Sequence, residues 1–250
     1  MPKNVDFTIK KDIAIITLKN EKKLNAWNSG MRACIIEFFK KLKKNKKIKA
    51  VIFTGSGAKA FCSGQDLNEL KNFSEKSVIK WLDQFKTLYT EIKSCEIPII
   101  GAINGVAAGS GFQLALLTDI RVSHNLAKFG QVEINSGIVS IIGPWIIEKV
   151  LGYSKSVELC ITGSLVKGKI AKEKGIVHYI TNKNNVMKKS MQIAKELSLK
   201  PNIAMRLTKK RLFEIFKKDM NTTFKIAAKY HKKSFKAGEP QKITKKFLKK

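Results

Sequence analysis

The chain has few cysteines, and they are not arranged as metal ligands or as a disulfide framework. The four are Cys34, Cys62, Cys95 and Cys160, which are widely scattered and form no C-x-x-C pair. This spacing favours neither zinc binding nor disulfides, and it fits a reducing compartment. The first twenty residues contain no apolar core typical of a secretory signal, and no apolar run reaches the ~18 residues of a membrane-spanning helix. We therefore expect a cytoplasmic protein that does not bind membranes.

Arginine is scarce although the chain is strongly basic. The formal net charge is +30 from 49 basic and 19 acidic residues, yet only Arg32, Arg121, Arg206 and Arg211 are arginine. Phosphate clamps and base readers favour arginine because its guanidinium is planar and forked. No segment interleaves basic and aromatic residues as nucleic-acid stacking platforms do. We interpret the lysines mainly as a solvated surface, whose field would also attract polyanionic ligands such as nucleotides.

The common signatures of metal and phosphate sites are also missing. The three histidines, His124, His178 and His231, lie far apart in the sequence. No P-loop is present, and no G-x-G-x-x-G motif follows a strand-like segment. We therefore expect no bound metal.

The first half of the chain alternates strand-like and helix-like segments. A length of 250 residues with 44% hydrophobic and 27% charged residues is typical of a globular protein with one large or two small domains. The expected strands are 5–9, 13–18, 50–54 and 98–103, and the expected helices are 29–43, 77–93 and 109–117. The first two strands predict a hairpin. The order of the others predicts an α/β fold with parallel strands and helical crossovers.

After about residue 182 the pattern is helical only. Segments 191–199, 203–216 and 224–235 carry apolar residues at helical spacing, and a short helix follows Pro240. These helices are coated with lysine and have a narrow apolar stripe. We expect that stripe to pack on the core or on a sister subunit.

Two turns rich in small residues each follow a strand-like segment and precede a helix. The first is 59–67, which contains Gly64 and Gln65, and the second is 104–113, which contains Gly109 and Ser110. Glycine permits close approach of backbone to a ligand, and a helix start offers free N–H groups at a positive dipole end. The N–H groups of Gln65 and Ser110 together would form an oxyanion hole.

A third segment, 129–137, places one carboxylate, Glu133, among apolar and small residues. Desolvation there would raise the pKa of Glu133 and make it a better general base. Taken singly, each of the three segments also fits an ordinary turn or a surface glutamate.

The three segments in this order and spacing resemble the crotonase superfamily, the enoyl-CoA hydratase/isomerase family. The resemblance covers Leu24-Asn25-Ala26, the Phe-Cys-Ser-Gly-x-Asp turn, the Asn-Gly-x-Ala-x-Gly-x-Gly turn and Phe-Gly-Gln-x-Glu, and it continues through 159–163 and 175–177 to the helical tail. It implies a crotonase (ClpP-like) spiral of ββα units over 1–195. It also implies a C-terminal all-helical region, 196–250, used to form a homotrimer or a hexamer built from two trimers.

The resemblance implies an enzyme that binds an acyl-CoA thioester and stabilises its enolate with the N–H groups of Gln65 and Ser110. Glu133 matches the family's acid/base, with Gln113 beside it. Hydratases of the family usually carry a second glutamate at the position of Gln113, and glutamine cannot take a proton from water. This departure favours an enoyl-CoA isomerase with a single catalytic glutamate. A hydratase, a hydratase-lyase or a decarboxylase stays an alternative.

The resemblance also implies which residues contact the substrate, whose coenzyme A is the only cofactor expected. The candidates are Lys23, Leu24, Ala26, Lys59, Ala60, Cys62, Gly64, Asp66, Gly109 and Trp145. Lys23 and Lys59 would lie near the nucleotide phosphates, and Trp145 would form a wall of the acyl pocket. Two other readings remain open: an RNA-binding homologue, because the chain is so basic, and a catalytically silent member that only assembles.

Overall fold

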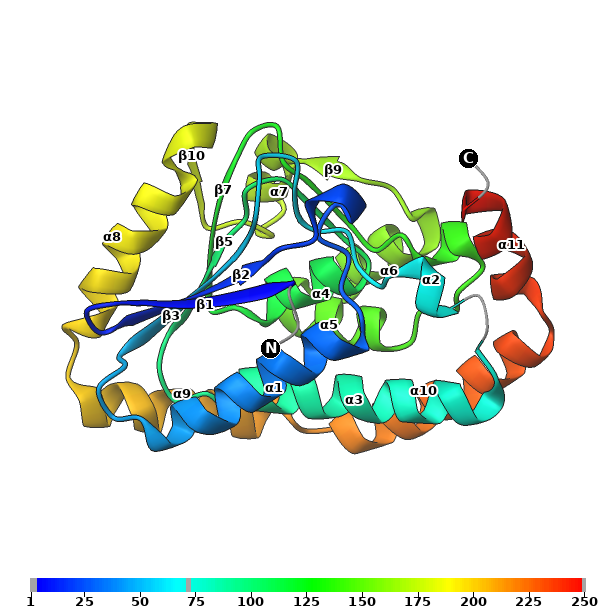
Figure 1. Ribbon diagram of the computed structural model, residues 1–250, viewed down its shortest axis with the longest axis horizontal. Helices are drawn as coiled ribbons and strands as arrows, with labels where there is room; N and C mark the ends of the chain where they lie inside the picture. The colour runs from blue at the N-terminus through cyan, green and yellow to red at the C-terminus, as the bar shows by residue number, and fades with distance from the viewer. Residues whose placement is uncertain (1–3, 71–72, 249–250) are drawn as a thin grey trace.

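The computed structural model describes residues 4–70 and 73–248, which form two β-sheets flanked by helices (Figure 1). The larger sheet has the strand order β1-β2-β3-β5-β7-β10 and the smaller the order β4-β6-β8-β9. The strands of the larger sheet are β1 (Val5–Lys10), β2 (Ile13–Leu18), β3 (Ala50–Gly55), β5 (Ile99–Ala102), β7 (Ile120–His124) and β10 (Tyr179–Thr181). Those of the smaller sheet are β4 (Ala60–Cys62), β6 (Val106–Ala108), β8 (Lys128–Gly130) and β9 (Val166–Lys167).

Successive pairs of strands divide between the two sheets. The pairs β3–β4, β5–β6 and β7–β8 each contribute one strand to the larger sheet and the next to the smaller. Within each sheet these strands are parallel neighbours, for example Val51 opposite Ile99 and Ala107 opposite Phe129. The chain therefore turns around the same axis three times, as the predicted spiral of ββα units requires. Because parallel strands end at one edge, the segments that follow β4, β6 and β8 meet there.

The helices are α1 (Ser29–Lys44), α2 (Leu67–Leu70), α3 (Glu75–Lys93), α4 (Ser110–Leu117), α5 (Ile142–Leu151), α6 (Tyr153–Thr162), α7 (Gly168–Glu173), α8 (Val186–Ser198), α9 (Asn202–Phe216), α10 (Met220–Lys236) and α11 (Glu239–Leu248). Short 3₁₀ turns lie at η1 (Glu21–Lys23), η2 (Glu133–Ser136) and η3 (Lys183–Asn185). The predicted hairpin, parallel strands and long helices are all present. The second predicted helix begins two residues early because Ser74 caps it, accepting a hydrogen bond from the N–H of Ser77.

The central strands β2, β3 and β5 of the larger sheet are buried on both faces because helices cover both sides. In β2, Ala14, Ile16 and Leu18 join the core that packs against α1 and α3. Ile13 and Ile15, one residue out of phase, pack with α8 on the opposite face. Figure 1 shows α8 on one side of this sheet and α1 and α3 on the other. None of the described helices is long and apolar enough to cross a bilayer.

The last helices return to the body of the chain. Helix α10 packs on α3 and α5, and α11 packs on α2. Figure 1 shows α10 running beside α3 and α11 at the end of the molecule near α2. The boundary expected between the spiral core and the C-terminal helical region, after residue 195, falls inside α8, which packs on the larger sheet. The C-terminal helices therefore form part of the wall around the site described next.

Candidate functional site

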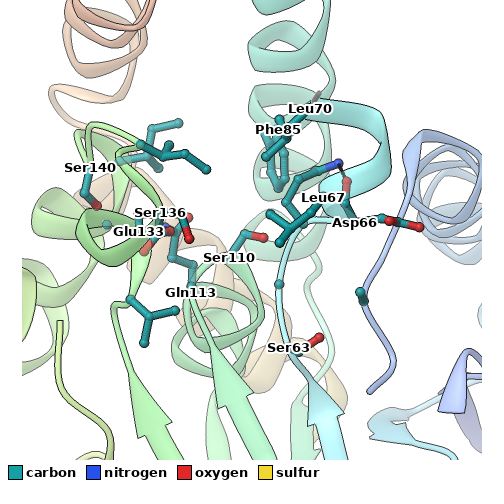
Figure 2. A pocket seen from close by; sticks show the side chains of 18 of the residues that line it. Ser63, Asp66, Leu67, Leu70, Phe85, Ser110, Gln113, Glu133, Ser136 and Ser140 are labelled. Atoms are coloured by element: carbon teal, nitrogen blue, oxygen red, sulfur yellow. Dashed lines mark hydrogen bonds between the residues drawn. The ribbon is translucent and has the colours of Figure 1, made fainter. Parts of the chain in front are cut away.

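A cavity of about 640 Å³ opens where the segments after β4, β6 and β8 come together. Its lining comes from the turn after β4, the start of α4, η2, and the helices α2, α3 and α10. Figure 2 shows Ser110 and Gln113 between Glu133 on one side and Asp66 and Leu67 on the other. Leu70 and Phe85 lie at one end of the pocket and Ser63 at the opposite end.

The turn after β4 directs one backbone N–H toward the cavity. Gly64 has φ +103, a left-handed conformation that favours glycine, and a Cβ there would lie 2.8 Å from the oxygen of Ala108. The N–H of Trp27 donates to the Gly64 oxygen at 2.9 Å, and the N–H of Asp66 donates to the Trp27 oxygen at 3.0 Å. Gln65 lies between these bonds, and its own N–H donates to no atom among the described residues.

The start of α4 provides a second free N–H beside the first. Gly109, with φ +54, precedes the helix, and its oxygen accepts from the N–H of Gln113 at 3.0 Å. The N–H of Ser110 is the first of the helix and has no acceptor in the described part of the chain. Its nitrogen would lie 3.4 Å from a Cβ on Gly64, so the two turns touch.

The serine at this position does not obstruct the N–H. Trp27 is fully buried and its indole N–H donates to the Ser110 hydroxyl at 2.9 Å. The hydroxyl is therefore held by the buried tryptophan. Together the two N–H groups and the helix dipole can stabilise a negatively charged oxygen.

Glu133, the first residue of η2, faces these donors across the cavity. A Cβ on Gly109 would lie 3.4 Å from its Oε1, which is van der Waals contact, so the carboxylate lies directly against the start of α4. Oε1 accepts a hydrogen bond from Gln113 Nε2 at 3.0 Å. Oε2 is enclosed and has no hydrogen-bond partner in the described part of the chain. Burial raises the pKa of Glu133 to about 7, which suits a group that must both accept and donate a proton near neutrality.

A buried tyrosine sets the orientation of Gln113. The hydroxyl of Tyr89, in α3, donates to Gln113 Oε1 at 2.7 Å. With Oε1 occupied in this way, the amide nitrogen must point toward Glu133. Burial, followed by the nearby charge of Glu133, raises the pKa of Tyr89 well above its ordinary value, so the phenol stays a donor. The three side chains form a fixed chain of hydrogen bonds that ends at the carboxylate.

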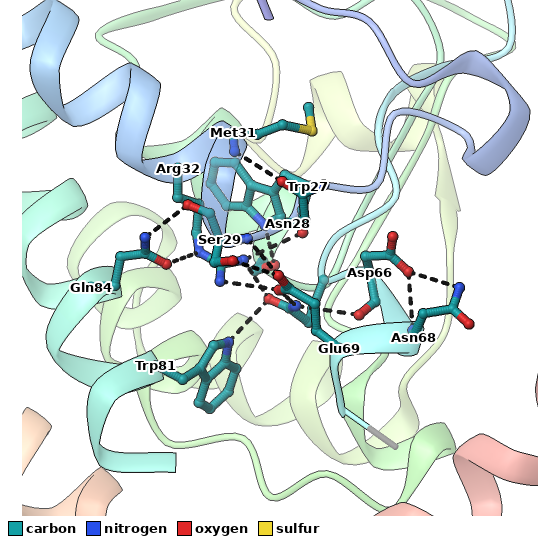
Figure 3. A network of polar contacts seen from close by, with 12 residues as sticks. Trp27, Asn28, Ser29, Met31, Arg32, Asp66, Asn68, Glu69, Trp81 and Gln84 are labelled. Atoms are coloured by element: carbon teal, nitrogen blue, oxygen red, sulfur yellow. Dashed lines mark hydrogen bonds and ion pairs between the residues drawn. The ribbon is translucent and has the colours of Figure 1, made fainter. Parts of the chain in front are cut away.

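A second polar network, which includes Arg32, Glu69 and Trp81 (Figure 3), holds the side chain of Gln65. Arg32, only 1% exposed, donates from Nη1 to Gln65 Oε1 at 2.6 Å and pairs through Nη2 with Glu69 at 3.3 Å. Trp81 Nε1 also donates to Gln65 Oε1, at 3.0 Å, and Gln65 Nε2 donates to Glu69 at 2.7 Å. The guanidinium lies 4.7 Å from the centroid of the Phe85 ring. Both the oxygen and the nitrogen of the Gln65 side-chain amide are therefore held by hydrogen bonds, and Gln65 is the residue whose backbone N–H is free.

The mouth of the cavity carries an ion pair. Lys23 Nζ lies 2.6 Å from Asp66 Oδ2, and Ser63 Oγ donates to the Lys23 oxygen at 3.1 Å. Burial opposes ionisation of Asp66, but hydrogen bonds from Lys23 and Asn68 outweigh it and lower its pKa. The lysine keeps 45% of its side chain exposed beside the opening.

Ten of the fourteen residues singled out in the sequence line this cavity. They are Lys23, Leu24, Ala26, Gly64, Gln65, Asp66, Gly109, Ser110, Gln113 and Glu133.

Lys59, Ala60, Cys62 and Trp145 do not line it. Ala60 and Cys62 lie in β4 with their side chains buried, and Lys59 is exposed just before that strand. Burial raises the pKa of the Cys62 thiol to about 12, which leaves it unreactive. The ring of Trp145 packs at 4.8 Å on Phe216, in α9, because its helix turns that side away from the pocket.

Several residues of the site were not singled out in the sequence. Tyr89 and Phe85 come from α3, and His231 comes from α10. A helical stripe of apolar and aromatic residues gives no indication of which members face a cavity. Arg32 carried a weak signal, because it is one of only four arginines and it interrupts the apolar face of its helix. No cluster of three or more potential metal ligands occurs within residues 4–70 and 73–248.

Comparison with known proteins places this site in a family. The model of the family described as enoyl-CoA hydratase/isomerase matches residues 8–250. YngF of Bacillus subtilis, which carries the provisional name enoyl-CoA hydratase/isomerase, is 30% identical over 94% of this chain and 91% of its own. The short-chain-enoyl-CoA hydratase of Clostridium acetobutylicum is 27% identical over 84% and 81%, and the 1,2-epoxyphenylacetyl-CoA isomerase of Escherichia coli is 26% identical over 90% and 87%.

Solved structures agree with the fold described above. An enoyl-CoA hydratase/isomerase from Mycobacterium paratuberculosis superposes with a TM-score of 0.91 at 23% identity, covering 98% of this chain and 99% of that one. The enoyl-CoA hydratase of Bacillus halodurans gives 0.88 at 23% identity, over 97% and 99%. The two sheets, the spiral of strand pairs and the C-terminal helices are therefore those of the crotonase fold. The chain belongs to the enoyl-CoA hydratase/isomerase family.

Proposed function

We propose that this protein moves the double bond of an enoyl-CoA, with Glu133 as its single proton carrier and the N–H groups of Gln65 and Ser110 as its oxyanion hole. The observation that supports this best is the pair Gln113–Glu133. The amide donates to one carboxylate oxygen, Oε1, and the other, Oε2, has no hydrogen-bond partner within the described residues. An enclosed base with one free oxygen is suited to shuttling a proton along a substrate.

The proposed reaction balances with this one carboxylate. The Glu133 carboxylate removes a proton from C2 of a 3-enoyl-CoA, and the electrons move to the thioester oxygen as a dienolate. The two N–H groups stabilise the oxygen that becomes negative. The protonated Glu133 then returns the same proton to C4, the dienolate collapses, and the double bond ends between C2 and C3.

Hydration is the second candidate, since relatives carry hydratase names. The Clostridium acetobutylicum relative is named as a hydratase and the Escherichia coli relative as an isomerase. In this site Gln113 already accepts from Tyr89 and donates to Glu133, so one N–H remains to hold a water. The other carboxylate of the lining, Asp66, is paired with Lys23. A water in this pocket would therefore have Glu133 alone to activate it.

The test separates the two reactions on one protein. Purified wild type and Gln113→Glu are assayed with matched 2-enoyl- and 3-enoyl-CoAs, following hydration and double-bond migration separately. We expect migration to dominate in wild type and hydration to rise clearly in Gln113→Glu, where two neighbouring carboxylates titrate as a pair. Full hydration by wild type, with no gain in the variant, would identify a hydratase instead.

We also propose that the chain assembles through its C-terminal helices, either as a homotrimer or as a hexamer built from two such trimers. Ile203 and Leu207 lie one turn apart on α9 and are 74% and 61% exposed, and Leu199 before them is 76% exposed. Exposed apolar side chains of this kind are typical of a subunit contact. Light scattering should give a trimer or its multiple, and Ile203→Glu combined with Leu207→Glu should dissociate it. A monomeric wild type would contradict the proposal.

A further inference from the structure

The pocket has a polar side chain at its apolar end. Leu70 and Phe85 mark one end of the cavity, and Ser63 marks the other (Figure 2). The Trp81 ring lies 5.3 Å from that of Phe85, and the His231 ring lies 5.2 Å from that of Trp81, edge to face. His231 therefore belongs to the end away from Ser63 and the exposed Lys23. In the proposed function this is the end that receives the acyl chain.

His231 has no hydrogen-bond partner within the described residues. Its side chain is 97% buried, with 3% exposed, and Nδ1 is enclosed and unpaired. No hydrogen bond joins Nε2 to the described chain either, and the indole N–H of Trp81 is already donated to Gln65. Buried polar atoms are almost always paired. Nδ1 is shut off from the pocket, so a ligand could pair only with Nε2, which is not among the enclosed unpaired atoms. An unpaired Nε2 on a residue that lines the pocket indicates a partner supplied by the ligand.

The charge state of this imidazole limits what that partner can be. Burial lowers the pKa of His231 to about 4, so the ring is neutral and offers one N–H donor and one acceptor. A neutral ring among aromatic side chains cannot compensate a buried carboxylate. It can pair with a hydroxyl, which donates and accepts, or with a carbonyl oxygen.

We propose that His231 selects acyl-CoA substrates whose acyl chain carries a neutral oxygen, a hydroxyl or carbonyl, beyond the reacting carbons. This inference rests on the proposed acyl-CoA function. A plain alkyl chain would fill the same space but would leave the imidazole unpaired, and a site built to bind a polar group discriminates against analogues that lack it.

The experiment compares matched acyl-CoAs with and without a terminal hydroxyl. Saturated acyl-CoAs of about six to ten carbons and their ω-hydroxy counterparts are titrated by calorimetry, because they bind without reacting. At the best length we expect wild type to bind the hydroxylated member about tenfold more tightly, as one buried hydrogen bond provides. His231→Phe keeps an aromatic ring and should abolish that preference. His231→Gln, which can still donate and accept, should retain part of it.

Controls separate this inference from the proposed function. Tyr230→Phe, on the neighbouring and 47% exposed residue of α10, should leave the preference unchanged. The role of His231 would be overturned if wild type and His231→Phe showed the same ratio of affinities for hydroxylated and plain acyl-CoAs at every chain length. Tightest binding of an ω-carboxy acyl-CoA would also overturn it. If the hydroxyl preference depends on His231 but no enoyl-CoA reacts, the proposed reaction fails and the binding inference stands. If no acyl-CoA binds, both fail.

Discussion

Replacing Glu133 by glutamine should inactivate the enzyme and at the same time stabilise its fold at alkaline pH. Glutamine has nearly the same volume, and its carbonyl oxygen can still accept from Gln113 Nε2, so the hydrogen-bond chain from Tyr89 is kept. What is lost is the group that takes the proton. General acid–base catalysis contributes typically ~10²–10⁴-fold, and we expect a loss of that order with acyl-CoA affinity nearly unchanged.

The gain in stability follows from the cost of an enclosed negative charge. Burial raises the pKa of Glu133 from its ordinary 4.5 to about 7 in the folded protein. The folded state therefore holds this proton more tightly than the unfolded state does. The stability that protonation provides is complete below about pH 4.5 and is lost as the pH rises through about 7. From the unfolded and folded pKa values, ionisation of Glu133 lowers the free energy of unfolding by about 3 kcal/mol at pH 8.5 and by about 1 kcal/mol or less at pH 5.

Urea unfolding of wild type and Glu133→Gln at pH 5 and pH 8.5 measures this difference. The advantage of the variant should be about 2 kcal/mol larger at the higher pH. Glu173→Gln, which changes an exposed glutamate at the end of α7, serves as the control and should show no such dependence. In parallel, kcat/KM of wild type should fall below about pH 7 as Glu133 becomes protonated. The reasoning would be refuted if the stability difference between Glu133→Gln and wild type were the same at both pH values. Turnover of the variant within threefold of wild type would also refute it.

Three further predictions concern the neighbouring networks and the surface. Tyr89→Phe frees the oxygen of Gln113 and should lower kcat about tenfold with little change in KM, measured by steady-state kinetics; an unchanged kcat would exclude a positioning role. Arg32→Met removes the hydrogen bonds that this buried guanidinium donates to Gln65 and to the partly exposed Glu69, and it should destabilise the fold by ~1–3 kcal/mol in urea, whereas Arg211→Met, in an exposed pair, should cost under ~1 kcal/mol. RNA affinity should be weak and unspecific and should collapse by ~200 mM salt; sequence-selective binding that survives would favour a role on RNA.

Local patterns were sufficient to predict the hairpin, the parallel strands and the long helices, whereas the spiral was expected from the family resemblance. Strands β1 and β2 are rich in β-branched residues, and α1, α3 and α10 repeat apolar residues at helical spacing, so both are local signals. Short elements were not predicted. Strands β4, β6 and β8 have only three residues each, and they exist because neighbouring turns of the spiral pair with them. Pairing of that kind depends on residues far away in the chain.

The amino-acid sequence by itself determined the residues whose role depends on local backbone. Gly64 and Gly109 adopt left-handed conformations, and each precedes a residue whose N–H is then left free. Turns of this sort are short-range, so their residues could be named before the fold was known, and Glu133 could be named with them from its spacing.

Only the tertiary structure decided which long side chains reach those residues. The hydroxyl of Tyr89 bonds Gln113 across 24 positions, and Arg32 bonds the side chain of Gln65 across 33. His231 lines the pocket because α10 packs on α3, while Trp145, expected there, faces α9 instead. A helix has one apolar stripe, but where on that stripe a cavity opens depends on the crossing of other helices. That crossing is set by packing between distant segments, and so it could not be predicted from any one segment of the sequence.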